Sequence, residues 1–311
     1  MRIETILLAT DLSPLAIAAL PVVAGLARDL RASVQLVYAD AQASHPEGVA
    51  STLAMSDVQG RLESLQRAAR AWGLETTVRV LNGEPKDALR AAAERDRHAL
   101  LTLVHGVGHR GRASVTRSLV ANTAAPVLIV HAPELAAGGT LNLPIALSIG
   151  RICCAVTPEE RGSASLRVTA SLADALGARL TLATVLFARG VKPGLDGDGP
   201  LLPEPPPQLG DDIAAASLRM TALASDLGGG GNGSRVVAAE DPATGLAAAA
   251  LAIEADLIVA APRQRGALAR ALLGSVTERL LQLSPLPLLV LGEQAAHHVE
   301  GTTTGGASIV G

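Results

Sequence analysis

The chain has 311 residues, a net charge of −3 and a hydrophobic content of 49%, so it is long enough for two domains with sizeable cores. Trp72, Tyr38 and Phe187 are its only aromatic residues, and without a basic stripe or stacking rings we expect no nucleic-acid partner. No apolar run reaches membrane length, and the N-terminus reads as a strand rather than a signal peptide. We therefore expect a cytoplasmic protein with no membrane partner.

Continuous apolar runs alternate with helical segments along the first half of the chain. Such alternation with short connections predicts a parallel sheet with helices on both faces. The predicted strands are Ile6–Ala9, Val34–Tyr38, Thr77–Leu81, Leu100–Val104 and Val127–Val130. The predicted helices are about Leu15–Leu30, Val58–Trp72, Pro85–Arg95 and Ser114–Thr123.

The second half repeats the first, and the differences in spacing fall in loops, as expected for a duplicated domain. The matched segments are Ile6–Asp11 with Ile152–Thr157, Ser33–Tyr38 with Arg179–Thr184, Gly83–Pro85 with Glu240–Pro242, Ser114–Thr116 with Ser275–Thr277, and Pro126–Val130 with Pro287–Leu291. We predict domains at 1–133 and 148–292, a linker at 134–147 and a disordered tail at 293–311.

Three kinds of segment resemble the universal stress protein family: the opening strand and loop Ile6–Ser13, the fourth strand Asp256–Val259, and the last helix and strand, Leu272–Arg279 and Pro287–Val290. The resemblance implies two tandem doubly wound domains, each a five-stranded parallel sheet of order 3-2-1-4-5. It also implies adenine-nucleotide binding in one branch of the family and none in another. The binding branch has a glycine signature, in which two loop glycines are followed by Gly-Ser or Gly-Thr.

The second half keeps only the end of this signature. The three glycine positions fall on Ala261, Gln264 and Gly274, with Ser275 next, and Thr157 stands where the first half has Asp11. A helix beginning at Gly274-Ser275 can hold an anion on its free N–H groups, although an ordinary Ser cap has the same sequence.

The first half has the complementary losses. Asp11 is present, but the loop from His105 to Ser114 is four residues shorter, and Ala113 replaces the last glycine. This loop is basic and glycine-rich, so Gly106, Gly108 and the Ser114 amide could cradle an anion while Arg110 or Arg112 supplies charge. Asp11 could equally cap the first helix with Ser13.

The expected ligand is therefore ATP or a related nucleotide, and Mg²⁺ is expected only when the nucleotide is bound. The candidate binding residues are Ala9, Asp11, Gly106, Gly108, Arg110, Ser114, Arg263, Arg265, Gly274, Ser275 and Val276.

No catalytic set or metal-ligand cluster can be assembled by spacing. His105 and His109 lack a visible carboxylate or nucleophile and read as solvated loop histidines rather than acid-base groups. Cys153 and Cys154 are neighbours in a strand, so they point to opposite faces and read as small buried residues.

Three functions remain open. The chain can be a stress-response protein with degenerate nucleotide sites, an interaction protein that binds no nucleotide, or, least favoured, a slow ATPase or nucleotidyl transferase. The resemblance also implies an internal pseudo-dimer through Val127–Val130 and Leu288–Leu291, because uncovered apolar sheet edges invite pairing. Pairing of two whole chains rests on the resemblance alone.

Overall fold

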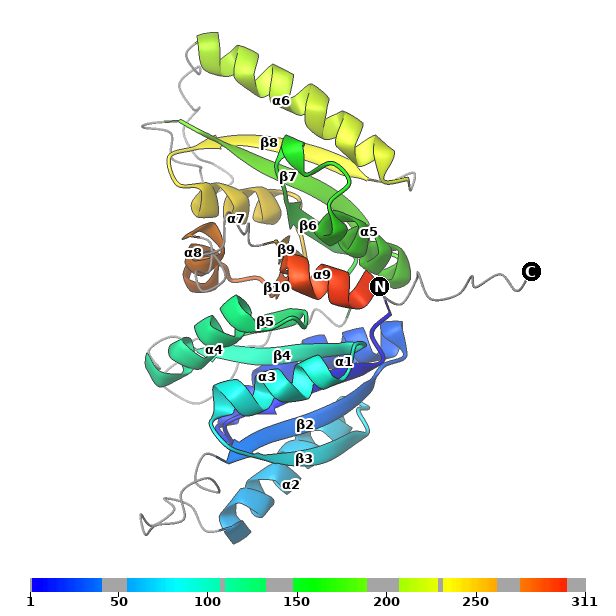
Figure 1. Ribbon diagram of the computed structural model, residues 1–311, viewed down its shortest axis with the longest axis vertical. Helices are drawn as coiled ribbons and strands as arrows, with labels where there is room; N and C mark the ends of the chain where they lie inside the picture. The colour runs from blue at the N-terminus through cyan, green and yellow to red at the C-terminus, as the bar shows by residue number, and fades with distance from the viewer. Residues whose placement is uncertain are drawn as a thin grey trace, which may run out of the picture.

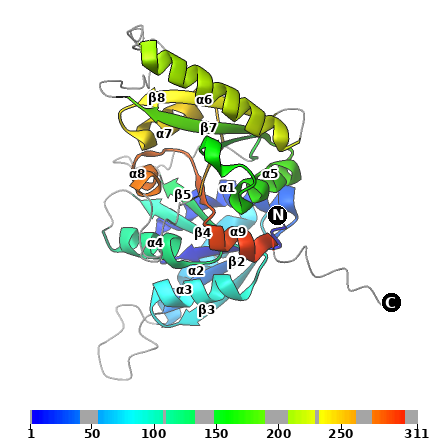
Figure 2. The same cartoon turned by 45° about the horizontal axis from the view of Figure 1, so that its top comes forward.

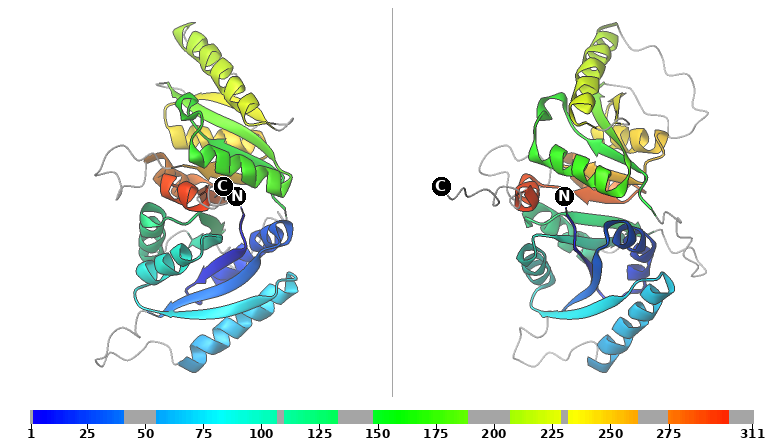
Figure 3. Two further views of the ribbon diagram at one scale, coloured as in Figure 1. Left: turned by 45° about the vertical axis from the view of Figure 1, so that its right-hand side comes forward. Right: turned by 90° about the vertical axis from the view of Figure 1, so that its right-hand side faces the viewer.

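The computed structural model describes residues 2–40, 55–106, 110–132, 148–188, 207–228, 232–261 and 275–300. Two α/β halves stack along the long axis of the molecule, with the helix Met55–Ala71 (α2) at one end and the helix Pro207–Asp226 (α6) at the other (Figures 1 and 3). Within the described ranges, no helix has both the length and the apolarity to cross a bilayer. The predicted linker, 134–147, lies outside these ranges.

Both halves contain the predicted alternation of strands and helices. The first half consists of β1 (Thr5–Thr10), the 3₁₀ helix η1 (Pro14–Ala19), α1 (Leu20–Leu30), β2 (Ser33–Asp40), α2, β3 (Thr76–Asn82), α3 (Pro85–Arg95), β4 (Ala99–Gly106), α4 (Arg110–Asn122) and β5 (Val127–Ala132). The second half consists of β6 (Arg151–Ala155), the 3₁₀ helix η3 (Pro158–Glu160), α5 (Ala164–Leu176), β7 (Arg179–Phe187), α6, β8 (Gly233–Ala239), α7 (Pro242–Ala252), β9 (Leu257–Ala260), α8 (Ser275–Leu283), β10 (Leu288–Val290) and α9 (Glu293–Glu300).

Local sequence explains where several helices begin and end. Proline opens both α3 and α7, at Pro85 and Pro242, where its missing N–H and fixed φ suit the first helical position. The Ser163 hydroxyl accepts a hydrogen bond from the Leu166 amide and caps α5, which ends at Gly177 with φ 62°. That left-handed conformation is the common way to satisfy the last carbonyls of a helix.

The ten strands of the described residues form one sheet, in the order β3-β2-β1-β4-β5-β10-β9-β6-β7-β8. Each half therefore has the order 3-2-1-4-5, and its strands are parallel. The two halves meet where β5 pairs antiparallel with β10, with Leu289 opposite Leu128 and Leu288 opposite Ile129. We call this junction the seam.

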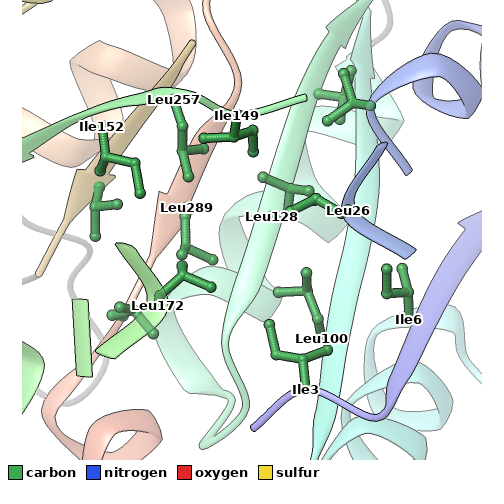
Figure 4. Packing of buried hydrophobic residues seen from close by; sticks show 14 of the residues in the cluster. Ile3, Ile6, Leu26, Leu100, Leu128, Ile149, Ile152, Leu172, Leu257 and Leu289 are labelled. Carbon is green, nitrogen blue, oxygen red and sulfur yellow. The ribbon is translucent and has the colours of Figure 1, made fainter. Parts of the chain in front are cut away.

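The sheet separates two apolar layers. On one face, α1, α2, α5, α6 and α9 contribute to a cluster that includes Leu128 and Leu289, and on the other face α3, α4, α7 and α8 cover Ile129 and Leu288. Leu128 and Leu289 lie close together across the seam, beside Ile149 and Leu257 (Figure 4). Each of the two layers therefore runs through both halves.

The adjacent cysteines lie on opposite faces of β6, as predicted. Cys153 belongs to the cluster under α7 and Cys154 to the cluster under α5, and neither forms a disulfide. Burial raises the pKa of Cys153 to about 12 and that of Cys154 still further. Both are therefore thiols that fill space rather than reactive thiolates.

The C-terminal segment differs from the prediction of disorder after Glu293. Residues 293–300 form α9, which packs against α5 (Figure 2). Ala295 and Ala296 are buried, so these small side chains let the helix approach the core closely. The prediction is wrong for residues 293–300 because the apolar face of this segment is short and gains its stability only from packing on α5. Residues 301–311 lie outside the described ranges.

Candidate functional site

Each half has a cleft at the carboxyl ends of its central strands. The first, of about 320 Å³, lies beside the ends of β1, β2 and β4, and the second, of about 290 Å³, lies beside the ends of β6, β7 and β9. In each half the strand order reverses between the first and fourth strands. Ligands of open parallel sheets bind at this kind of position, and both volumes are at the small end of the range for ligand pockets.

The two clefts are lined by matching positions of the repeat. The pairs are Ala9 with Ala155, Asp11 with Thr157, Tyr38 with Thr184, Pro85 with Pro242, Leu89 with Leu246, Val115 with Val276, and Thr116 with Thr277. The apolar positions are retained in kind, whereas the polar positions at the ends of the first and second strands differ. The clefts therefore share a shape but offer different hydrogen-bonding groups.

The floor of the first cleft is a tight turn after β1. The Asp11 carboxylate accepts a hydrogen bond from the Ser13 amide at 3.1 Å, and the Thr10 hydroxyl accepts one from the Leu12 amide at 2.9 Å. Asp11 therefore orders the turn itself, as aspartate commonly does. Its side chain is exposed at the cleft, where its charge can also meet a ligand.

Leu12 holds this turn in an unusual backbone conformation. Its φ is 63°, a region that leucine rarely occupies and that costs about 1 to 3 kcal/mol. Its side chain is buried against Val58, Leu62 and Tyr38, and its carbonyl oxygen accepts from Arg61 at 3.4 Å. Non-glycine residues held in this region are concentrated at functional sites.

Tyr38 places a phenol beside the same cleft. Burial, and then the charge of Asp40, raise the pKa of Tyr38, so its hydroxyl stays protonated and can donate as well as accept. Among the described residues that line the two clefts, Tyr38 is the only Phe, Tyr or Trp. The first cleft therefore combines a carboxylate, a phenol and an apolar wall.

The second cleft has a different polar floor. Thr157 replaces the aspartate, and its hydroxyl lies 3.5 Å from a carboxylate oxygen of Glu160, a cleft residue in η3. The wall includes Pro242, which follows the α7 cap Asp241. Thr244 and Arg279 donate to Asp241 and lower its pKa. This carboxylate is therefore committed to holding α7 and α8 together.

Comparison with known proteins identifies the family. The sequence pattern of the universal stress protein family matches residues 2–131 and again residues 148–292. The chain belongs to the universal stress protein family. It resembles the crystal structure of a universal stress protein from Archaeoglobus fulgidus, at 15% identity and a TM-score of 0.61, over 93% of this chain and 96% of that chain.

A protein of unknown function from Pseudomonas aeruginosa is similar at 16% identity and a TM-score of 0.58, over 96% of each chain. No curated protein matches the chain. At these identities the structural similarity establishes the fold alone. The two family matches make this chain a tandem universal stress protein.

The structure places four predicted ligand residues of this universal stress protein at the clefts. Ala9 and Asp11 line the first cleft, and Ser275 and Val276, the first residues of α8, line the second. The amides at the start of α8 therefore lie at a cleft, where a helix favours an anion. Gly106 ends β4 and Arg110 begins α4. Four further candidates lie outside the described residues: Gly108, Arg263, Arg265 and Gly274.

The structure differs from the predicted start of α4, on which the role of the Ser114 amide depends. We expected α4 to start at Ser114, but it starts at Arg110, so Ser114 lies beyond the first turn. Only the first four N–H groups of a helix lack an intrahelical partner. Arg110, Arg112 and Ala113 are adequate helix formers, and the glycines around them suggested a loop instead.

His105 is also not the solvated loop histidine that the sequence suggested. It lies within β4, and its ring packs edge-on against His131 of β5, with 5.7 Å between ring centroids. Its Nδ1 atom is buried, and burial lowers the pKa of His105. His109 lies outside the described residues.

Sequence reasoning missed the threonines and prolines that line both clefts. Thr116 and Thr277 each end a Ser-Val-Thr repeat, and Pro85 and Pro242 each end a repeated tripeptide. These residues belong to the segments that match between the two halves of the sequence. A repeated segment can be core, turn or site, however, and only the fold distinguishes these.

Proposed function

We propose that this universal stress protein binds ATP or a related adenine nucleotide in its first cleft and takes part in a stress response through the partners that the bound form selects. One observation carries the proposal. Asp11 stands at the switch point of the first half on a turn whose Leu12 has φ 63°. The second half has neither feature, since Thr157 replaces Asp11 and Pro158, whose ring keeps φ negative, stands at the position of Leu12.

The chemistry of the first cleft suits a nucleoside. Asp11 can accept hydrogen bonds from sugar hydroxyls or base amino groups, and the Tyr38 phenol can donate or accept beside it. Leu89, Leu103 and Val115 supply an apolar wall for a base. The sequence between His105 and Ser114 carries Arg110 and Arg112, which are suited to phosphate. Mg²⁺ would enter only with the phosphates.

We propose weaker nucleotide binding in the second cleft. Thr157 offers no carboxylate there, and the lining residue Glu160 would repel a phosphate. Ala261 adds a Cβ atom where the family's binding branch has glycine, so the backbone cannot approach a phosphate as closely. Among the described residues of this cleft, the start of α8 is a feature that favours an anion.

Two measurements test the proposal. Mass spectrometry of material released from the purified protein should detect an adenine nucleotide. Titration calorimetry with Mg-ATP should then show binding about tenfold weaker or more in Asp11→Ala, because a hydrogen bond to a charged group contributes roughly 1.5–3 kcal/mol. Thr157→Ala is the matched control at the equivalent position, and its affinity should stay within about twofold of the unmodified protein.

Other results would point to the other functions. If neither the unmodified protein nor its Thr157→Ala variant binds an adenine nucleotide, the proposal fails, and an interaction protein without nucleotide becomes the better description. If Asp11→Ala and Thr157→Ala weaken binding equally, the ligand does not prefer the first cleft. Turnover of ATP that depends on time and Mg²⁺ would instead indicate an ATPase.

A further inference from the structure

His131 in β5 reaches across the seam to two carbonyl groups of the second half. Its Nε2 atom lies 3.0 Å from the carbonyl oxygen of Leu281 in α8, and its Nδ1 atom lies 3.1 Å from that of Leu286. A neutral imidazole has one N–H group and can donate to only one of them. The neutral ring therefore anchors the seam by one bond and turns a nitrogen lone pair toward the other oxygen.

His105 is the neighbour of this ring and has a different environment. The two histidines are opposite each other in the β4–β5 pairing, and their rings meet at 76°. Within the described part of the chain, the buried Nδ1 of His105 has no hydrogen-bond partner. A protonated His105 would have an N–H group on that atom, and a buried donor without an acceptor is costly.

Apart from Asp11, which lines the same cleft as Val104, the described surroundings provide little negative charge to offset positive charge on this pair. Residues 284–287, β1, β10 and η1 carry no ionisable side chain. Three of the acidic groups on the neighbouring helices or their partners are already paired: Glu278 of α8 with Arg117 of α4, Asp241 with Arg279 of α8, and Asp87 with Arg90 within α3. The side chain of Glu94 accepts from the Ala124 amide. The other ionisable groups on these helices are cations: Lys86, Arg95, Arg110 and Arg112.

The histidine pair also lies between the two clefts. Val104, directly before His105, lines the first cleft, and α8, whose Leu281 carbonyl meets His131, begins at the second cleft. The contact therefore joins the end of β4 to α8 through β5, and these elements are neighbours in the fold (Figure 1).

We propose that His105 and His131 form a proton-sensitive contact that holds the two halves together at the seam at neutral pH and loosens it under mild acid. Opening the seam would expose both rings to water, which would solvate each charged imidazole. A proton on His131 alone would let that ring donate to both carbonyls, so the loosening depends on His105. Two charged rings 5.7 Å apart repel each other, and a closed seam leaves the Nδ1 proton of a charged His105 without an acceptor. Acid that charges both rings therefore favours the open form.

The pKa of each ring is shifted in the direction that the proposal requires. Burial lowers the pKa of His131, and the charge of His105 lowers it further, against the two carbonyl contacts that raise it. Burial also lowers the pKa of His105. A histidine with a lowered pKa in the closed form contributes stability above the ordinary value of about 6.5, and that stability is lost as the pH falls from there toward the lowered pKa.

The first test follows the two rings by NMR. The C2–H signals of His105 and His131 in the full chain should titrate below about 6.5, and His105→Phe should raise the midpoint of His131 because it keeps a ring but removes the charge. Midpoints near 6.5 for both seam histidines, or no change at His131 in His105→Phe, would overturn the proposal.

The second test measures the seam itself. Hydrogen–deuterium exchange at pH 7.5 and 5.5, corrected for intrinsic exchange rates, should show a loss of protection of up to about tenfold in β5 and β10, because pH 5.5 lies about one unit below the ordinary histidine value of about 6.5. His105→Phe should lose clearly less, and His297→Gln should behave like the unmodified protein. If His105→Phe does not fold, His105→Asn provides the uncharged variant. If the unmodified protein and the His105 variant lose equal protection at pH 5.5, the pair does not control the seam. The same conclusion follows if the unmodified protein loses no protection.

Discussion

Gly245 in α7 is a residue whose lack of a side chain the fold uses directly. A Cβ atom there would lie 2.9 Å from the Cβ of Ala239 and 3.0 Å from a methyl carbon of Val185, closer than packed atoms tolerate. We predict that Gly245→Ala lowers the free energy of unfolding by about 1–3 kcal/mol, the usual cost of overpacking. Gly60→Ala in α2 is the control, since nothing lies within 4 Å of that position and alanine is the better helix former by about 1 kcal/mol. Urea unfolding measures both changes, and a neutral Gly245→Ala would mean that α7 moves away from the sheet at little cost.

At the scale of elements, the seam depends on β5 and β10 more than on the ion pair beside them. Leu289 is 2% exposed, and we predict that Leu289→Ala costs about 2–5 kcal/mol because it leaves a cavity in the shared core. Arg117 and Glu278 form a 2.8 Å ion pair between α4 and α8, but both side chains are exposed. Arg117→Ala should therefore cost no more than about 1 kcal/mol. Denaturant unfolding of the two variants provides the comparison, and similar losses would argue that the ion pair contributes to the seam as strongly as the apolar strands do.

At the scale of the molecule, the ten-stranded sheet predicts that the halves stay together without a covalent connection. A protease site introduced between residues 134 and 147 allows the chain to be cut after folding. The cut halves should elute as one species in native size-exclusion chromatography, because the β5–β10 pairing and the core across it remain. The same cut in a Leu289→Asp chain should release separate halves, since an unpaired carboxylate is costly in an apolar core. Separation of the otherwise unmodified halves would contradict this prediction.

The local pattern of residues predicts the alternation of strands and helices in both halves, apart from α9. Continuous apolar runs such as Val127–Val130 predict buried parallel strands because hydrophobic pattern is a local property, and the observed strands of the first half agree with the prediction to within about two residues at each end. The opposite burial of Cys153 and Cys154 followed from the two-residue period of a strand. The strand order followed from the family resemblance, which both halves share.

The contacts between distant segments, by contrast, are set by the folded chain. An apolar edge shows that a strand can pair, but the antiparallel register that sets Leu289 opposite Leu128 depends on both halves being folded. The short helix α9 gains its stability from α5, and a ring such as His131 becomes a contact only because α8 brings the Leu281 carbonyl to it. The clefts have the same origin, since each draws its lining from strands and helices far apart in the chain. Burial and pairing energies of this kind depend on neighbours in space, which a local pattern of residues does not contain.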